Sequence, residues 1–243
     1  MAGDTAERQE NGIVREVSRA VKLNKGNPIT VVAGKTKIPG VVKAEKFTGR
    51  QEGGSEPYTD IVLTTSDGAA LNLSCKGKTA PSLAGGGLTG LELAVPGIST
   101  KFMKAAFNHL QTKLKLKPGD KVPDVYGKIS GGNALAIVQG NAKMGGPIDY
   151  MFIGTMDVSV KYDQNKNELT FGDTQITDAK TYANNHTLYF RLRARREDQR
   201  FDPTAKDSKG APKIYGKSPS RGDSAGRIVV QDKPPLQAII VSI

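Results

Sequence analysis

The sequence has one cysteine, two histidines and no long apolar run. Cys75 alone cannot form an internal disulfide or a multi-cysteine zinc cluster, which indicates a reducing compartment. His109 and His186 lie far apart and lack the spacing of a metal-binding pair. No stretch approaches the roughly 18 apolar residues of a membrane span, and the polar N-terminus lacks the apolar run of a secretory signal. We therefore expect a soluble, cytoplasmic protein with no membrane partner.

Two hydrolase signatures are also missing. Three consecutive glycines occur at 85–87, but no Gly-Lys-Ser or Gly-Lys-Thr follows them, so nucleotide hydrolysis is not supported. The two histidines allow no argument for a Ser-His-Asp constellation either. Any enzymatic activity must therefore rest on other groups.

Positive charge is abundant. The chain has 35 lysine and arginine residues against 24 aspartate and glutamate residues, a formal net charge of +11. Such a balance favours DNA or another polyanion as the partner. Ribosome-associated, membrane-surface and virion proteins can be equally basic, so charge alone leaves the class of partner open.

Hydrophobic patterning predicts an α+β fold, with a mixed central sheet flanked by helices. Apolar residues at helical spacing predict helices over 11–23 and 99–115, and short β-branched runs predict strands at 29–33, 41–44, 59–65 and 69–76. We expect a flexible N-terminus (1–10), an α/β core (11–140) and a β-rich C-terminal part (141–243) with a basic loop at about 203–226.

The most readable segment is a hairpin at 59–76. Ser66-Asp67-Gly68 supplies a turn, so Thr65 should pair with Ala69, and counting inward places Asp60 opposite Ser74. Because side chains alternate along a strand, Asp60, Ser74 and Lys76 should share one face. Leu71, Leu73 and Cys75 should share the other with Ile61 and Leu63. An acid beside a lysine suits metal-assisted cleavage of a phosphodiester.

This hairpin resembles the PD-(D/E)xK, or restriction-endonuclease-like, nuclease superfamily, whose motif puts an acid on one strand and acid-x-Lys on the next. Thr59-Asp60-Ile61-Val62-Leu63 stands for the first half and Ser74-Cys75-Lys76 for the second. The resemblance spans roughly residues 10–115. It implies that Asp60 binds Mg²⁺ and that Lys76 is the catalytic lysine. It also implies a further carboxylate from the preceding helix, for which Glu16 is the first candidate and Glu45 the second.

Ser74 departs from the family pattern, because most active members carry Glu or Asp at that position. A neutral hydroxyl is a poor ligand for a divalent cation. The chain is therefore either an active nuclease or a degenerate member that retains nucleic-acid binding. A third interpretation gives the hairpin no such role: Asp60 then caps a loop, and Lys76 is a solvated strand residue.

A second basic feature follows near the C-terminus. In HTLYFRLRARR, alternation places Leu188, Phe190 and Leu192 on one face, and Tyr189, Arg191, Arg193 and Arg195 on the other. Arginines spaced along a strand can follow phosphates, and a tyrosine can stack on a base. Alternatively, these arginines pair with Glu197 and Asp198. The following loop adds Lys213, Lys217 and Arg221 as candidate contacts, although its composition also suits plain disorder.

Together these features predict a nucleic-acid-binding protein, either a divalent-metal-dependent DNA endonuclease or a degenerate relative from a tailed phage. The alternative is a non-enzymatic virion structural or assembly protein of a phage. That alternative draws on the glycine-rich loops, the basic extension and a general resemblance of the chain to proteins of tailed phages. It implies a location in the host cytoplasm or the virion, with homo-oligomeric or other assembly partners.

Overall fold

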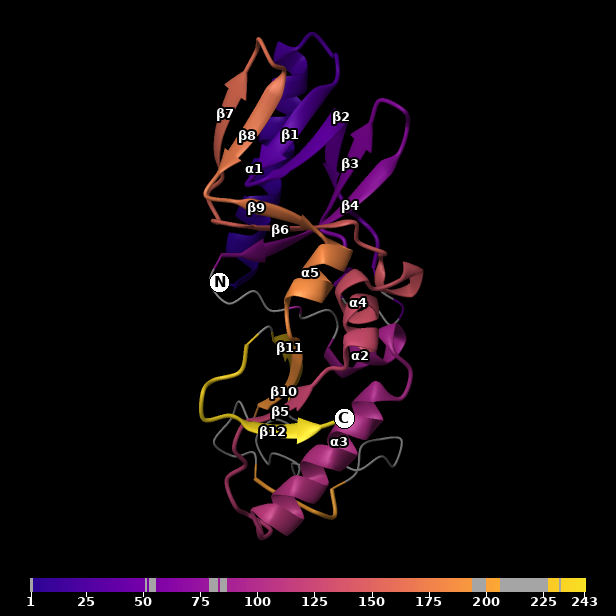
Figure 1. Cartoon of the computed structure of the whole chain (residues 1–243), viewed down its shortest axis with the longest axis vertical. Coiled ribbons are helices and arrows are strands. Elements are labelled where there is room, and N and C mark those ends of the chain that lie inside the picture. Colours follow the sequence, from indigo (N-terminus) through magenta and orange to yellow (C-terminus); the bar gives the residue numbers. More distant parts are fainter. Residues whose placement is uncertain are drawn as a thin grey trace. The chain divides into compact units, whose positions relative to one another are not determined.

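The chain folds into two units in the computed structural model (Figure 1). The structure describes residues 2–50, 52, 56–78, 83, 87–193, 200–205, 227–231 and 233–243. The first unit comprises residues 1–81 and 135–185, and the second comprises 82–134 and 186–243. The division therefore differs from the expected boundary at residue 140. It differs because residues 150–154 pair with the hairpin strand 70–77, which draws a later segment into the first unit.

The first unit is built on an eight-stranded mixed sheet in the order β7-β8-β1-β2-β3-β4-β6-β9. Neighbouring strands are antiparallel except β1 with β8 and β4 with β6, which are parallel. The elements are α1 (Ala2–Leu23), β1 (Ile29–Ala33), β2 (Thr36–Lys46), β3 (Ile61–Thr65), β4 (Ala70–Gly77), β6 (Tyr150–Gly154), β7 (Ser159–Asp163), β8 (Glu168–Gly172), β9 (Gln175–Asp178) and α5 (Ala179–Asn185). The predicted α+β class with a mixed central sheet is confirmed.

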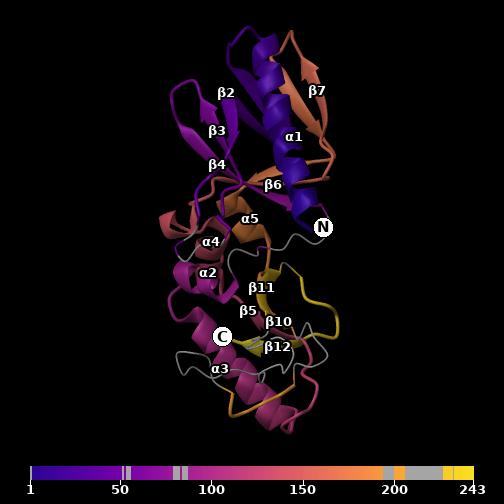
Figure 2. The same cartoon turned by 180° about the vertical axis from the view of Figure 1, so that it is seen from behind.

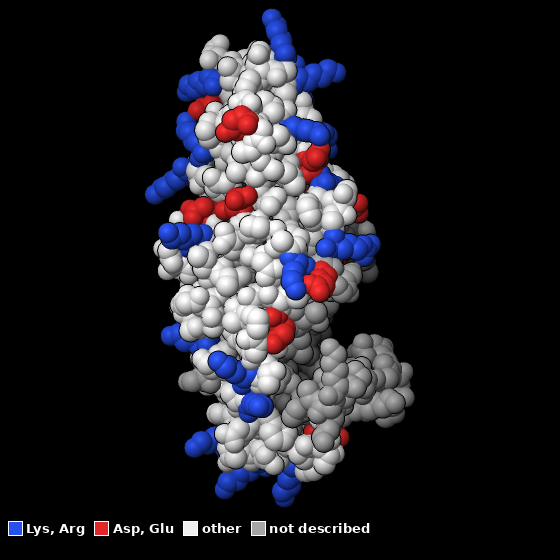
Figure 3. All heavy atoms as spheres, turned by 90° about the vertical axis from the view of Figure 1, so that its right-hand side faces the viewer, with Lys and Arg blue, Asp and Glu red and all other residues white. Residues whose placement is uncertain are grey.

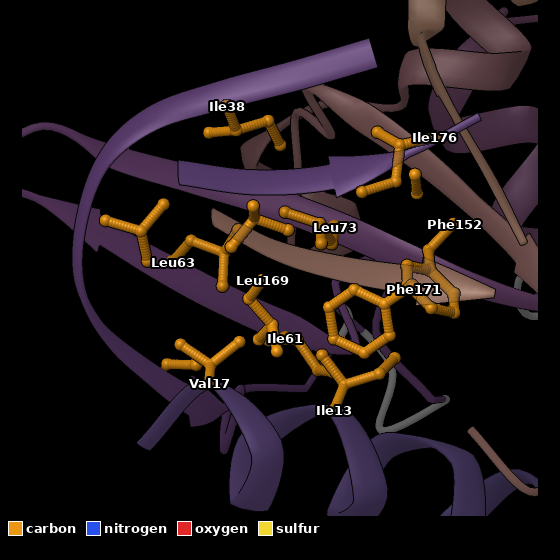
Figure 4. Packing of buried hydrophobic residues seen from close by; sticks show 14 of the residues in the cluster. Ile13, Val17, Ile38, Ile61, Leu63, Leu73, Phe152, Leu169, Phe171 and Ile176 are labelled. Carbon is orange, nitrogen blue, oxygen red and sulfur yellow. The ribbon is translucent and has the colours of Figure 1, made fainter. Parts of the chain in front are cut away.

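Helix α1 lies across the sheet, as seen in Figure 2. Ile13, Val17 and Ala20 recur at helical spacing and are almost fully buried. In Figure 4, Ile13 and Val17 point from the helix toward Ile61, Leu63 and other strand residues. The helix starts at Ala2, whereas the helical spacing in the sequence predicted a helix from residue 11. Contacts from its first turns to the sheet, described below, account for the difference.

The sheet curls, so that its edge strand β9 reaches the turn between β1 and β2. Thr36 Oγ1 donates a hydrogen bond to the carbonyl oxygen of Ile176 at 2.5 Å. The enclosed core combines residues from α1 and the strands: Ile13, Val17, Ala20, Ile29, Val31, Ala33, Ile38, Val41, Ala44, Ile61, Leu63, Leu73, Phe152, Leu169, Phe171 and Ile176. One helix and one curled sheet therefore form a single core.

The second unit has a four-stranded sheet in the order β11-β10-β5-β12. Its elements are α2 (Gly87–Ala94), α3 (Ile98–Asn108) with a π-helical turn (His109–Lys113), β5 (Val125–Lys128), β10 (Tyr189–Arg193), β11 (Arg227–Gln231) and β12 (Ile239–Ser242). Helix α4 (Gly131–Gln139) carries the chain back to the first unit.

Helix α3 packs on this smaller sheet, and its Phe102 ring lies 5.8 Å from that of Phe190. The expectation that helix 99–115 packs on the central sheet is therefore wrong, because its apolar face packs against β5 and β12, and Phe102 reaches Phe190 of β10. None of the described helices is both long and apolar enough to cross a membrane.

The core predicts a strong effect of truncating Leu73, which is 1 % exposed. Leu73→Ala should lower the free energy of unfolding by about 3 kcal/mol, because it leaves a cavity between α1 and β4. Urea unfolding followed by circular dichroism measures this change. Leu236→Ala is the matched control, since Leu236 is fully exposed, and it should leave the stability unchanged. Equal effects of the two substitutions would contradict the packing described.

Candidate active site at the end of the hairpin

The β3–β4 hairpin has the predicted register. Ile61 pairs with Leu73, and Leu63 pairs with Leu71. The turn closes with the Thr65 amide donating to the carbonyl of Ala69 at 2.9 Å. Ser74 Oγ lies 3.2 Å from Asp60 Oδ2, which places these two side chains opposite each other. The predicted faces are also confirmed, because Leu71, Leu73 and Cys75 pack with Ile61 and Leu63 in the core.

The Asp60 carboxylate gathers the polar residues. Its Oδ2 accepts hydrogen bonds from the Cys75 amide at 2.6 Å and from Ser74 Oγ at 3.2 Å, and Lys76 Nζ lies 3.6 Å away. Strand β3 begins at Ile61, so the carboxylate gives the Cys75 amide an acceptor where the regular ladder ends. The Asp60 and Lys76 side chains are 21 % and 22 % exposed, so the pair remains open to solvent on one side.

Ser74 is a donor in this arrangement. It is 3 % exposed, and its hydroxyl is directed to Asp60. Ser74 therefore fixes the carboxylate but adds no negative charge. At the position where the nuclease motif has its second acid, this chain has a neutral serine that hydrogen-bonds to the first acid, Asp60.

A second carboxylate comes from α1, from Glu10 and not from Glu16. Lys46 Nζ lies 3.0 Å from Glu10 Oε2 and 3.7 Å from Glu7 Oε1. Burial raises the pKa of Glu10 above its ordinary 4.5, the hydrogen bond from Lys46 opposes this, and the charge of Asp60 raises that pKa further. Two carboxylates, Glu10 and Asp60, are thus close enough to repel each other.

The structure does not bring Glu16 to the hairpin. Glu16 contacts Arg15 at 2.9 Å and Arg19 at 3.8 Å, and it lines a groove of about 520 Å³ beside β7 and β8. Six residues of helix separate it from Glu10, or about 9 Å along the axis. The second candidate, Glu45, is paired with Lys43 on the more exposed side of β2. Helical periodicity was the signal that could have indicated Glu10. The buried positions Ile13 and Val17 extend back by one turn to Gln9, and Glu10 is its neighbour.

Gln9 supports the backbone of the same site. It is 2 % exposed, and its Nε2 donates to the carbonyl oxygens of Thr155 at 3.1 Å and Lys76 at 3.4 Å. These bonds tie the ends of β4 and β6 to α1. The buried Gln9 amide thereby fixes the backbone position of Lys76.

We call Glu10, Lys46, Asp60, Ser74 and Lys76 the hairpin site. Within the described part of the chain, no three His, Cys, Asp or Glu side chains come together to hold a metal ion. Asp60 Oδ1 nevertheless lacks a protein donor among the described residues, and Glu10 lies nearby. Mg²⁺ commonly uses one or two carboxylates together with water and substrate phosphate. Asp60 and Glu10 are the two carboxylates of the hairpin site that could serve as ligands of that kind.

The structure describes only part of the arginine-rich segment that begins at Leu188. Leu188, Phe190 and Leu192 are buried as predicted. Arg191 donates from Nε at 3.0 Å and from Nη2 at 2.6 Å to Asp124 Oδ2, and its guanidinium lies 5.7 Å from the centre of the Tyr126 ring. Among the described residues, the acid that holds it is Asp124, whereas Glu197 and Asp198, the expected partners, lie outside the described part. Tyr189 is half-buried on the same strand. The Arg193 side chain and residues Arg195, Lys213, Lys217 and Arg221 lie outside the described part.

The chain matches no family model, no curated protein and no solved structure. The hairpin site must therefore be judged by its own geometry.

The charge arrangement predicts the direction of two pKa changes at Glu10. Asp60→Asn should lower the pKa of Glu10 by removing a repelling charge, whereas Lys46→Met should raise it by removing a donor. Because the folded pKa exceeds 4.5, the stability contributed by protonated Glu10 is present below that pH and is lost as pH rises through the folded pKa. Carboxyl ¹³C NMR titration measures these shifts. If Glu10 titrates identically in all three proteins, the proximity of the two carboxylates is refuted.

The Arg191 contacts predict a structural cost. Arg191→Ala should lower the free energy of unfolding by about 2 kcal/mol, because a partly buried charge-assisted hydrogen bond is lost. A double-mutant cycle with Asp124→Ala should give a coupling energy of about 1 kcal/mol or more. Arg200→Ala, at an exposed position, is the control. If Arg191→Ala keeps the stability of the unmodified chain but no longer binds DNA, Arg191 is a nucleic-acid contact and not a structural residue.

Proposed function

We propose that the chain binds nucleic acid and cleaves phosphodiester bonds at the hairpin site with the help of Mg²⁺. One observation carries the proposal. The Lys76 ammonium lies 3.6 Å from the Asp60 carboxylate, and a second carboxylate is near enough for Asp60 to raise its pKa. An acid pair beside a lysine suits metal-assisted cleavage of phosphodiesters.

The roles of the residues follow from their contacts. Asp60 and Glu10 would hold the metal ion, which when bound polarises the phosphate and activates water. Ser74 and the Cys75 amide fix the Asp60 carboxylate. Lys46 holds Glu10 and offsets part of the repulsion between the two acids. Lys76 has three donors, and its charge would stabilise the negative charge that develops on the phosphate.

The chain offers a matched control for this pair. Lys78 Nζ lies 3.6 Å from Asp173 Oδ1, the same separation as in the Lys76–Asp60 pair. The two control side chains are 58 % and 77 % exposed, so the interaction is a surface ion pair. Any effect of lost charge or lost pairing alone should appear equally at both places.

The test is cleavage of labelled single- and double-stranded DNA with Mg²⁺ or Mn²⁺. Asp60→Asn and Lys76→Met should each reduce the rate by at least about 100-fold, because each removes a group that stabilises the transition state. Asp173→Asn and Lys78→Met should cleave at the normal rate, and EDTA should abolish cleavage in every protein. Cleavage that survives both hairpin substitutions would overturn the proposal.

Two further variants separate the helix carboxylates. Glu10→Gln should abolish cleavage, whereas Glu16→Gln should not, since only Glu10 is held with the hairpin. DNA binding without cleavage in the unmodified chain would leave a degenerate nuclease fold that retains binding. Absence of both activities would favour the alternative of a phage structural or assembly protein.

A further inference from the structure

Positive charge is distributed unequally between the two units. The first unit has 16 lysine and arginine residues and 15 aspartate and glutamate residues, whereas the second has 19 and 9. Almost all of the net charge of +11 therefore belongs to the second unit. On the face shown in Figure 3, acidic and basic side chains are mixed over the first unit, and basic ones predominate over the second.

The longest acid-free segment of the second unit that the structure describes contains α3. Residues 98–119 include five lysines, at 101, 104, 113, 115 and 117, and no aspartate or glutamate. The apolar side of this segment is fixed against the sheet, since Ile98, Phe102, Ala106 and Leu110 are buried. Its lysines are consequently turned outward, and all five are exposed.

These lysines have no acidic partner within the described part of the chain. None of Lys101, Lys104, Lys113, Lys115 or Lys117 forms an ion pair with any residue that the structure describes. The first unit differs, because many of its basic side chains are held by acids, including Arg8 by Asp157 and Lys37 by Glu168. Unpaired lysines on one helix leave their charge available to an external anion.

We propose that this lysine face, defined as Lys101, Lys104, Lys113 and Lys115, docks the phosphate backbone of a nucleic acid. The helical stretch from Ile98 to Lys113 is about 24 Å long, enough to follow several phosphates. The exposed polar residues between the lysines include Asn108 and Gln111, whose side-chain amides are typical donors to phosphate and sugar. This inference rests on the proposed function for the choice of nucleic acid as the partner. Docking itself does not require cleavage.

The same geometry disfavours a lipid surface as the partner. An interfacial helix inserts its apolar side between lipids, but the apolar side of α3 is already buried against the small sheet. Leu114, which is 41 % exposed, is the large apolar side chain that remains at the surface beside the lysines. The lysine face therefore offers charge and hydrogen bonds, as a phosphate backbone requires.

The experiment measures DNA binding in EDTA, so that cleavage cannot contribute. Fluorescence anisotropy with labelled duplex and single-stranded DNA is recorded over a series of salt concentrations. The triple variant K101Q/K104Q/K115Q should bind duplex DNA at least about tenfold more weakly, and the slope of log K against log salt should fall by up to about 3. The control triple variant K22Q/K35Q/K180Q removes equal charge at exposed lysines of the first unit and should bind normally.

The outcomes are distinct. Equal losses in the two triple variants would show a diffuse effect of charge and overturn the assignment to α3. Failure of the unmodified chain to bind DNA, together with lysine-dependent binding to vesicles that contain phosphatidylserine, would overturn the choice of nucleic acid. Because the assay contains EDTA, its readout does not depend on cleavage at the hairpin site, so failure of the lysine face and failure of the proposed cleavage give different results. Melting curves of both triple variants should match that of the unmodified chain, since all six lysines are exposed and surface substitutions of this kind change stability little.

Discussion

The packing of α1 on the curled sheet is the constraint on which the first unit depends. One stripe of the helix fills the core through Ile13, Val17 and Ala20, and its preceding turns place Gln9 and Glu10 at the end of the hairpin. Helix α1 therefore supplies apolar side chains to the core and polar side chains to the hairpin site. Since a helix rotates by 100° per residue, burial of the stripe also fixes which acid reaches Asp60.

The Asp60 carboxylate links folding and chemistry in a comparable way. It completes the ladder by accepting from the Cys75 amide, and it lies within reach of Lys76. Two hydrogen bonds and one ammonium group thus converge on Oδ2. Under the proposed function, the carboxylate that closes the ladder would also hold the metal ion through Oδ1, which has no donor among the described residues.

Sequence patterns predicted the hairpin well, because a short turn and alternation along two adjacent strands determine its register. They also predicted the buried face of β10, for the same reason. They misplaced the third group of the site, since Glu10 and Glu16 are both acids on one helix and only tertiary packing distinguishes them. The helix 99–115 was assigned to the wrong sheet, because an apolar face specifies burial but not the partner that buries it.

The discontinuous first unit has a consequence for how the chain acquires its structure. Strand β4 needs β6 as its parallel neighbour, yet the 53 residues at 82–134 of the second unit lie between the two segments of the first. During synthesis, the edge of β4 therefore remains unpaired until residues 150–154 leave the ribosome. Late, non-local pairing of this kind slows folding and exposes a strand edge to other chains. The inserted residues cannot complete their own sheet in the meantime, because β5 pairs with β10 and β12 from residues 186–243, so each unit waits for a later segment of the chain.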